Sequence, residues 1–182
     1  MTGNQEKRRA CRNNIVLVGF MGSGKTTIGR ELSKTLMMPR FDLDDLIEER
    51  ERRTIPEIFA ESGEAGFRKA ETQVISSLVR SGAQGYVYST GGGCVTVAEN
   101  IPLLKELGLV VYLKISPETV IRRIGRDTSR PLLQTPDRES RVKQMMEERE
   151  PMYQAAADVV IEADHGRIPE IVDEICRARK EL

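Results

Sequence analysis

Short apolar runs alternate along the chain with segments whose apolar residues recur every three or four positions. The runs predict strands over residues 15–18, 39–42, 86–89, 109–115 and 159–161, and the periodic segments predict helices over residues 27–36, 44–53, 64–80 and 168–179. Two more helices are expected to begin after the capping residues Thr54 and Ser116. Regular alternation of strand and helix is typical of a parallel sheet with helices on both faces. The pattern therefore predicts a three-layer α/β/α fold with a five-stranded parallel sheet.

The first strand leads into a glycine-rich segment, residues 19–26, with the sequence Gly-Phe-Met-Gly-Ser-Gly-Lys-Thr. This segment fits the phosphate-binding pattern G-x-x-x-x-G-K-[ST] at every fixed position, and it lies between a strand and a helix as that pattern requires. A chance glycine turn between a core strand and a core helix is the alternative. The lysine and threonine in register, and the correct flanks, favour a P-loop.

A P-loop binds phosphate through backbone N–H groups that face one concavity and through the positive end of the following helix. Lys25 can reach the β- and γ-phosphates of a nucleotide, and the Thr26 hydroxyl can ligate Mg²⁺. We therefore expect ATP to be held by residues Gly22, Ser23, Gly24, Lys25, Thr26 and Thr27.

Two aspartates, Asp42 and Asp44, follow the short second strand. Ligands of open α/β sheets bind beyond the carboxyl ends of the strands, and strand alternation predicts that both side chains point the same way. One could hold Mg²⁺ and the other could hold or deprotonate a substrate hydroxyl. Capping of the next helix by Asp44 or Asp45 is the structural alternative. Because no Walker-B pattern precedes residue 109, Asp42 is the better acidic partner for the metal.

Other candidate binding groups lie further along the chain. Arg68 could pair with Glu71 three residues later on one helix, or it could turn its planar guanidinium to a substrate carboxylate; Arg149 is a second candidate. The glycines 91–93 stand at a strand's carboxyl end, where they let a backbone come close to a ligand. Cys94 beside them is expected to be a small buried residue and not a nucleophile.

The segment from residue 125 to 137 has two prolines and no clear period. A loop of this length in a compact domain is often an active-site lid, and the alternative is a plain surface loop. In a lid, Arg130 would bring a second positive charge to a moving phosphoryl group. We therefore expect a mobile lid that supplies Arg130 as a catalytic residue beside Lys25 and Asp44.

Composition excludes several other function classes. The chain of 182 residues carries 28 basic and 28 acidic residues, with few aromatic residues, so we expect no nucleic-acid partner. Three widely spaced cysteines favour a reducing cytoplasm, and the apolar runs are too short to span a membrane. The only histidine, His165, is expected in a solvated loop, with a contact to a nucleotide base as the minor alternative.

Residues 1–12 are expected to be a disordered or frayed extension of a single domain over 13–182, which we expect to be monomeric.

Taken together, the chemistry-bearing motifs resemble those of the shikimate kinases, a family of P-loop small-molecule kinases. The resemblance extends over about residues 14–180 and rests on the segments 19–26, 42–44, 67–68, 91–93, 130–133 and 149–153. It implies transfer of the γ-phosphoryl group of ATP, with Mg²⁺, to the 3-hydroxyl of shikimate on the route to chorismate and the aromatic amino acids.

The resemblance also implies a role for each matching residue. Asp44 would bind the shikimate hydroxyls and could act as a base, and the region from about 42 to 71 would hold shikimate. Asp42 would be the acid near Mg²⁺ and Arg123 would lie against adenine. Arg68 and Arg149 would match the arginines that bind the shikimate carboxylate. The glycines that would line the same pocket are Gly91, Gly92 and Gly93. Arg130 would match the lid arginine.

Two other classes of function stay open at this point. A related kinase that acts on gluconate or a nucleoside monophosphate would share the P-loop and the lid, but we would not expect it to combine Asp44 with Arg68 and Arg149. A nucleotide-binding switch or non-catalytic module would not need these residues, and the guanine-reading Asn-Lys-x-Asp pattern of GTPases is absent.

Overall fold

The computed structural model describes residues 13–124 and 137–181, and within them it has a five-stranded parallel sheet with the strand order β2-β3-β1-β4-β5. The strands are β1 (Ile15–Val18), β2 (Arg40–Asp42), β3 (Val87–Ser89), β4 (Leu109–Lys114) and β5 (Val159–Glu162). Every described pairing between neighbouring strands is parallel, as in the register of Leu17 opposite both Ser89 and Val111. The predicted fold class is confirmed.

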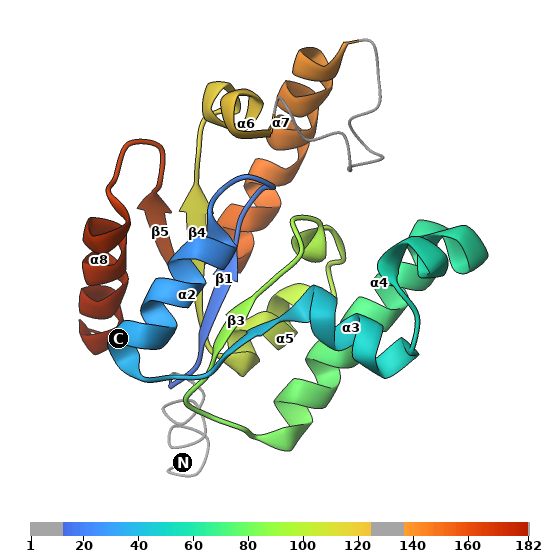
Figure 1. Cartoon of the computed structure of the whole chain (residues 1–182), viewed down its shortest axis with the longest axis horizontal. Coiled ribbons are helices and arrows are strands. Elements are labelled where there is room, and N and C mark those ends of the chain that lie inside the picture. Colours follow the sequence, from blue (N-terminus) through green and yellow to red (C-terminus); the bar gives the residue numbers. More distant parts are fainter. Residues whose placement is uncertain (1–12, 125–136, 182) are drawn as a thin grey trace.

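Helices cover both faces of this sheet (Figure 1). They are α2 (Lys25–Leu36), α3 (Leu43–Glu51), α4 (Ile55–Ser81), α5 (Asn100–Leu107), α6 (Pro117–Ile124), α7 (Arg138–Ala156) and α8 (Ile168–Glu181), with a short 3-10 helix η1 (Cys94–Thr96). Helices α2 and α8 pack together on one face, while α5 and α7 pack against β4 on the other. Helices α3 and α4 contact each other beyond the β2 edge.

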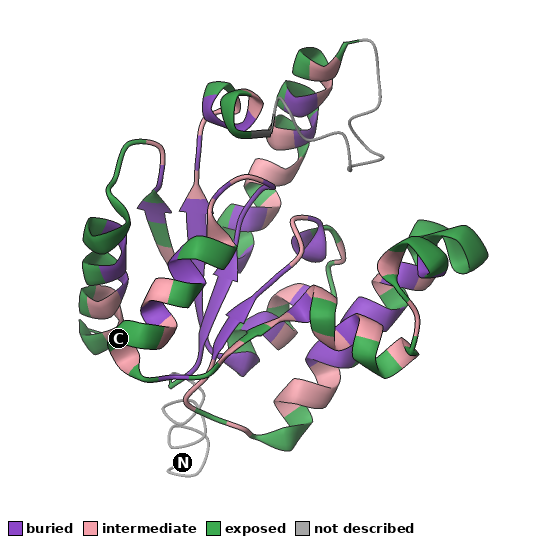
Figure 2. Ribbon diagram, viewed as in Figure 1, coloured by how far each residue is buried: buried purple, intermediate pink, exposed green. Residues whose placement is uncertain are grey.

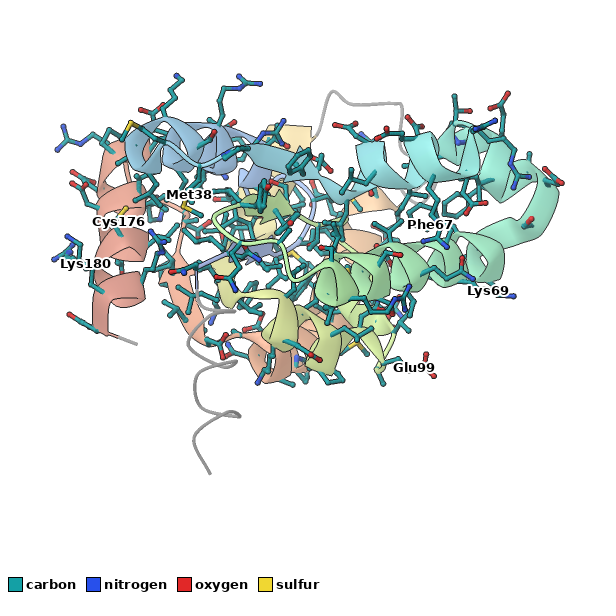
Figure 3. All side chains as sticks on the ribbon, turned by 90° about the horizontal axis from the view of Figure 1, so that it is seen from below. Met38, Phe67, Lys69, Glu99, Cys176 and Lys180 are labelled. Carbon is teal, nitrogen blue, oxygen red and sulfur yellow. The ribbon has the colours of Figure 1, made fainter. Side chains whose placement is uncertain are left out.

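The core lies between the central strands and the inner faces of the helices. Strand β1 is fully buried at all four positions, which explains its uninterrupted apolar sequence (Figure 2). A second, smaller apolar cluster joins α3 to α4 around Ile47 and Phe67. Figure 3 shows Phe67 on the side of α4 that faces α3, whereas Lys69 extends from its outer side.

Helix α4 is two helices joined at a glycine. Thr54 and Glu57 form the predicted capping box, in which the Thr54 N–H donates to Glu57 Oε2 at 2.7 Å. Gly63 has φ 64° and ψ −171°, a left-handed conformation that side chains disfavour, and it interrupts the helical backbone. The predicted helix over 64–80 therefore forms the second part of α4.

The sequence patterns did not predict α5 or α7. Helix α7 is strongly charged, contains Pro151, and buries only scattered side chains such as Val142, Met145 and Tyr153. The predicted lid and the extension at residues 1–12 lie outside the described residues, except that Asp137 caps α7 by accepting from the Ser140 N–H at 3.1 Å. Among the described helices, none has the length and apolar character needed to cross a membrane.

Candidate active site

The carboxyl ends of the strands meet at one edge of the sheet, at the top in Figure 1, and a cavity of about 460 Å³ opens there. Parallel strands place their C-terminal loops side by side, so segments far apart in sequence share this edge. The lining residues are Met21, Gly22, Ser23, Gly24, Lys25, Thr26, Thr27, Ile28, Asp42, Asp44, Ser89, Thr90, Gly91, Gly92, Arg123, Ala163, Gly166, Ile168 and Ile171. The cavity thus joins the P-loop to Asp42, Asp44 and two of the three glycines.

The P-loop follows β1 and has the backbone that its glycines permit. Gly22 and Gly24 have φ angles of 79° and 91°, in the left-handed region, and Gly24 is the N-cap of α2. No acidic side chain stands in the first turn of α2, and within residues 13–124 and 137–181 no side chain caps it, so these N–H groups can bind an anion.

Lys25 turns its ammonium group back over the P-loop. Its Nζ donates to the carbonyl oxygens of Gly19 at 2.7 Å and Phe20 at 3.0 Å. Its Nζ also donates to Ser23 Oγ at 3.4 Å. These three acceptors are neutral oxygen atoms, and an ammonium group binds a phosphate anion more strongly than it binds neutral acceptors. The arrangement keeps a positive charge at the mouth of the loop.

Asp42, and not Asp44 or Asp45, caps the helix that follows β2. Its Oδ1 accepts from the Asp44 N–H at 3.3 Å, and its Oδ2 lies 3.5 Å from Arg40 Nη1. We expected the Asp42 and Asp44 side chains to point the same way because side chains alternate along a strand. That reason is wrong, because Asp44 belongs to the first turn of α3. Both carboxylates nevertheless line the same cavity.

Asp44 carries a buried carboxylate oxygen. Within the described residues, its Oδ1 has no hydrogen-bond partner. Burial and the nearby negative charge of Asp42 raise the pKa of Asp44, while the positive charges of Lys25 and Arg68 oppose that shift. Because Asp44 lines the cavity, its carboxylate is suited to accept a hydrogen bond from a ligand hydroxyl.

Arg68 forms an ion pair with Glu71, which the sequence suggested as the alternative to binding a substrate carboxylate. Its Nη1 lies 2.8 Å from Glu71 Oε2, and its Nη2 lies 3.3 Å from Glu64 Oε1. The Glu71 side chain is completely buried, and burial raises its pKa although Arg68 acts in the opposite direction. Burial alone would lower the pKa of Arg68, but the two carboxylates outweigh it and raise that pKa. The guanidinium is thus held charged and oriented.

Each glycine of the triplet leaves room for a different part of the site. A Cβ on Gly91 would lie 3.1 Å from Asp44 Oδ1, and one on Gly92 would lie 3.2 Å from the backbone nitrogen of Met21. A Cβ on Gly93 would lie 2.1 Å from Arg68 Nη2, which is a severe clash. The triplet therefore lets the Asp44 carboxylate, the P-loop backbone and the Arg68 guanidinium approach one backbone segment.

Arg149 reaches the same segment from α7. Its Nη1 donates to the Gly92 carbonyl oxygen at 3.4 Å, and its guanidinium carbon lies 5.7 Å from the centre of the Phe20 ring. The structure thus brings Arg68 and Arg149, from different helices, to adjacent glycines. It does not place either arginine in the lining of the 460 Å³ cavity itself.

Arg123 connects the P-loop to the loop after β5. Its Nη1 donates to the Gly22 carbonyl at 2.9 Å and its Nη2 to the Ala163 carbonyl at 3.3 Å. That loop and the start of α8 add apolar surface to the cavity at Ile168 and Ile171. His165 lies in the same loop and is exposed, as expected.

Several cavity residues were not selected from the sequence. Ser89 is the last residue of β3 and Thr90 follows it, and the Ser89 hydroxyl is buried without a hydrogen-bond partner in the described structure. Ala163 and Gly166 flank His165, whose loop was the only available signal for them. Cys94 is fully buried, and burial raises the pKa of its thiol well above the ordinary value, which disfavours the reactive thiolate.

Arg130, the predicted lid residue, lies outside the described residues. Thr26 and Asp42, the expected metal contacts, line the same cavity, whereas no group of three or more acidic, histidine or cysteine side chains that could hold a metal occurs among residues 13–124 and 137–181. Two oxygen groups suit Mg²⁺, which in phosphoryl-transfer sites takes its other ligands from phosphate and water.

The chain is similar to known proteins of one family. A family model described as shikimate kinase matches residues 21–180. The chain is 44% identical to shikimate kinase of Thioalkalivibrio sulfidiphilus over 91% of its length and 86% of the relative, and 45% identical to that of Halorhodospira halophila over 91% and 93%. The solved shikimate kinase of Acinetobacter baumannii in complex with shikimate is similar with a TM-score of 0.85 and 39% identity, covering 93% of this chain and 94% of that one. The chain therefore belongs to the shikimate kinase family.

Proposed function

We propose that this protein transfers the γ-phosphoryl group of ATP to the 3-hydroxyl of shikimate, giving shikimate 3-phosphate and ADP, in chorismate and aromatic amino acid synthesis. One observation carries the proposal. A P-loop and the buried carboxylate of Asp44 line a single cavity, and two arginines reach the glycines at its edge. The family relationship and the shikimate bound to the Acinetobacter baumannii relative support the same acceptor.

The P-loop would hold the phosphates of ATP. The N–H groups from Gly22 to Thr27 and the positive end of α2 would surround the β-phosphate, while Lys25 would leave its carbonyl partners for the β- and γ-phosphate oxygens. Phosphoryl transfer depends mainly on positioning and on positive charge at the moving group, and Lys25 supplies both.

Shikimate is a small anion with several hydroxyl groups, and the other half of the site is complementary to it. The guanidinium groups of Arg68 and Arg149 would bind its carboxylate, since planar guanidinium groups bind carboxylates through paired hydrogen bonds. Asp44 would accept the hydrogen bond of the 3-hydroxyl and orient its oxygen toward the γ-phosphorus. The Gly91, Gly92 and Gly93 backbone would line the pocket between them.

Mg²⁺ would be held near Thr26 and Asp42, and when bound it would neutralise charge on the β- and γ-phosphate oxygens. Arg123 would lie against adenine, next to the apolar surface of Ile168 and Ile171. We assign Arg130 the role of a second positive charge on the transferred group, which a closing lid over residues 125–137 would deliver.

We further propose that the protein works as a monomer in the cytoplasm. Cys94 and Cys176 are both free thiols, which fits a reducing compartment.

ADP release from Mg-ATP tests the proposal, measured with shikimate, with gluconate, with a nucleoside monophosphate and with no acceptor. Release that depends on shikimate supports it. Release with another acceptor would show that the acceptor assignment is wrong while the kinase assignment stands. Flat traces in all four, from protein that binds ATP, would contradict both.

A further inference from the structure

Two side chains of α7 converge on one backbone oxygen beside the proposed acceptor pocket. The buried Tyr153 hydroxyl donates a hydrogen bond to the Gly92 carbonyl oxygen, and Arg149, one helical turn earlier, donates to the same oxygen at 3.4 Å. We infer that Tyr153 is a positioning residue. By holding the Gly92 carbonyl oxygen, Tyr153 would orient the peptide between Gly92 and Gly93 so that the Gly93 N–H points to the bound acceptor. The inference rests on the proposed function for the identity of that acceptor.

Because a peptide unit is planar, the hydrogen bond to the Gly92 carbonyl oxygen also sets the direction of the Gly93 N–H. The peptide between Gly92 and Gly93 is trans, like every described peptide bond, so its N–H points opposite to its C=O. When Tyr153 holds the Gly92 carbonyl toward α7, the Gly93 N–H is directed away from α7. Within the described part of the chain this N–H makes no hydrogen bond, and the inference takes an oxygen of the substrate as its acceptor.

Gly93 lies beside the Arg68 guanidinium and directly after the two glycines that line the cavity. Its Cα is so close to the Arg68 guanidinium that a Cβ would lie 2.1 Å from Nη2. An anion bound by Arg68 would therefore meet the Gly93 backbone as well. Three glycines in a row have little resistance of their own to rotation. The Cys94 N–H closes the turn by donating to the Gly91 carbonyl oxygen at 3.2 Å, and the Tyr153 hydrogen bond adds a restraint on the central peptide of that turn.

Tyr153 is itself fixed by its surroundings. Its side chain is 2% exposed, and its ring stacks on that of Tyr112 with centroids 4.8 Å apart and planes at 13°. Burial raises the pKa of Tyr153, so its hydroxyl remains a protonated donor at every pH at which the protein would work. The Tyr112 hydroxyl instead donates to Glu150, which makes Tyr112 a matched control.

The test compares Tyr153→Phe with Tyr112→Phe, since each variant keeps its ring and loses one hydroxyl. With Tyr153→Phe we expect the KM for shikimate to rise about three- to tenfold, the range of one ordinary hydrogen bond, and the KM for ATP to stay within about twofold of wild type. Tyr112→Phe should leave both KM values unchanged. Thermal melting checks that each variant is folded.

NMR spectroscopy tests, without any substrate, whether Tyr153 orients the peptide between Gly92 and Gly93. In protein labelled with ¹⁵N-glycine, the Gly93 amide resonance should move in Tyr153→Phe and stay in place in Tyr112→Phe. An unmoved Gly93 resonance, or KM values for shikimate and ATP that rise together, would overturn the inference. If wild-type protein releases no ADP with shikimate, the proposed function fails instead, and the glycine resonances still report on the hydrogen bond.

Discussion

Arg68 Nη1 and Glu71 Oε2 lie 2.8 Å apart, and the Glu71 side chain of this pair is completely buried. The second carboxylate on Arg68 belongs to Glu64, whose side chain is 54% exposed. A buried partner fixes the guanidinium firmly, whereas an exposed one adds little because water and ions screen it. Glu71 therefore determines where the Arg68 guanidinium points.

Removing Glu71 should cost much more stability than removing Glu64. Glu71→Ala would leave a largely buried arginine with one exposed partner, so we expect the free energy of unfolding to fall by about 3 kcal/mol. Glu64→Ala, the matched control on the same helix, should change it by less than about 1 kcal/mol. Urea unfolding measures both. Equal losses in the two variants would show that burial does not set the strength of this pair.

Gly93→Ala should damage the acceptor site through Arg68. The new Cβ would overlap Arg68 Nη2, so the guanidinium must move and the KM for shikimate should rise by about tenfold or more, with little change for ATP. A double-mutant cycle with Arg68→Ala gives the control. The double variant should be no worse than Arg68→Ala alone. Additive losses would mean that Gly93 acts independently of Arg68.

The activity should fall in mild acid because of Asp44. Burial and the charge of Asp42 raise its pKa above the 3.8 of an ordinary aspartate, so it takes up a proton as the pH falls while other aspartates are still ionised. The acid limb of the kcat/KM profile should therefore lie above that value. Asp42→Asn removes the like charge but keeps a capping side chain, so the limb should move to lower pH. A limb that stays in place would contradict this account of Asp44.

Lys25 should be needed for catalysis, unlike a lysine further along the same helix. Lys25→Ala removes the positive charge at the P-loop, and we expect kcat to fall by about 1,000-fold. Lys34→Ala removes an exposed lysine that pairs only at the surface with Glu31, and kcat should stay within about twofold. Steady-state ADP release compares the two. A Lys25→Ala enzyme with near-normal kcat would remove Lys25 from the mechanism.

The sequence predicted the features that depend on local pattern. The apolar run of β1, the capping box at Thr54 and the P-loop are all encoded by neighbouring residues, and the structure has each of them. The family motifs also identified Asp44 and Arg68, which the structure brings to adjacent parts of one site.

Features that depend on contacts distant in sequence could not be predicted in this way. Helix α7 has no apolar stripe, because its few inward positions are interrupted by charged residues and Pro151. Its side chains Arg149 and Tyr153 contact Gly92 although they lie 57 and 61 residues away in the sequence. The reason for glycine at position 93 is likewise a guanidinium on another helix.

A phosphorus–proton NMR correlation on the product formed from Mg-ATP and shikimate identifies the hydroxyl that receives the phosphoryl group. We expect a new phosphate resonance coupled to the ring proton at carbon 3, because the proposed role of Asp44 is to orient the 3-hydroxyl. Coupling to the proton at carbon 4 or 5, or release of inorganic phosphate alone, would contradict it.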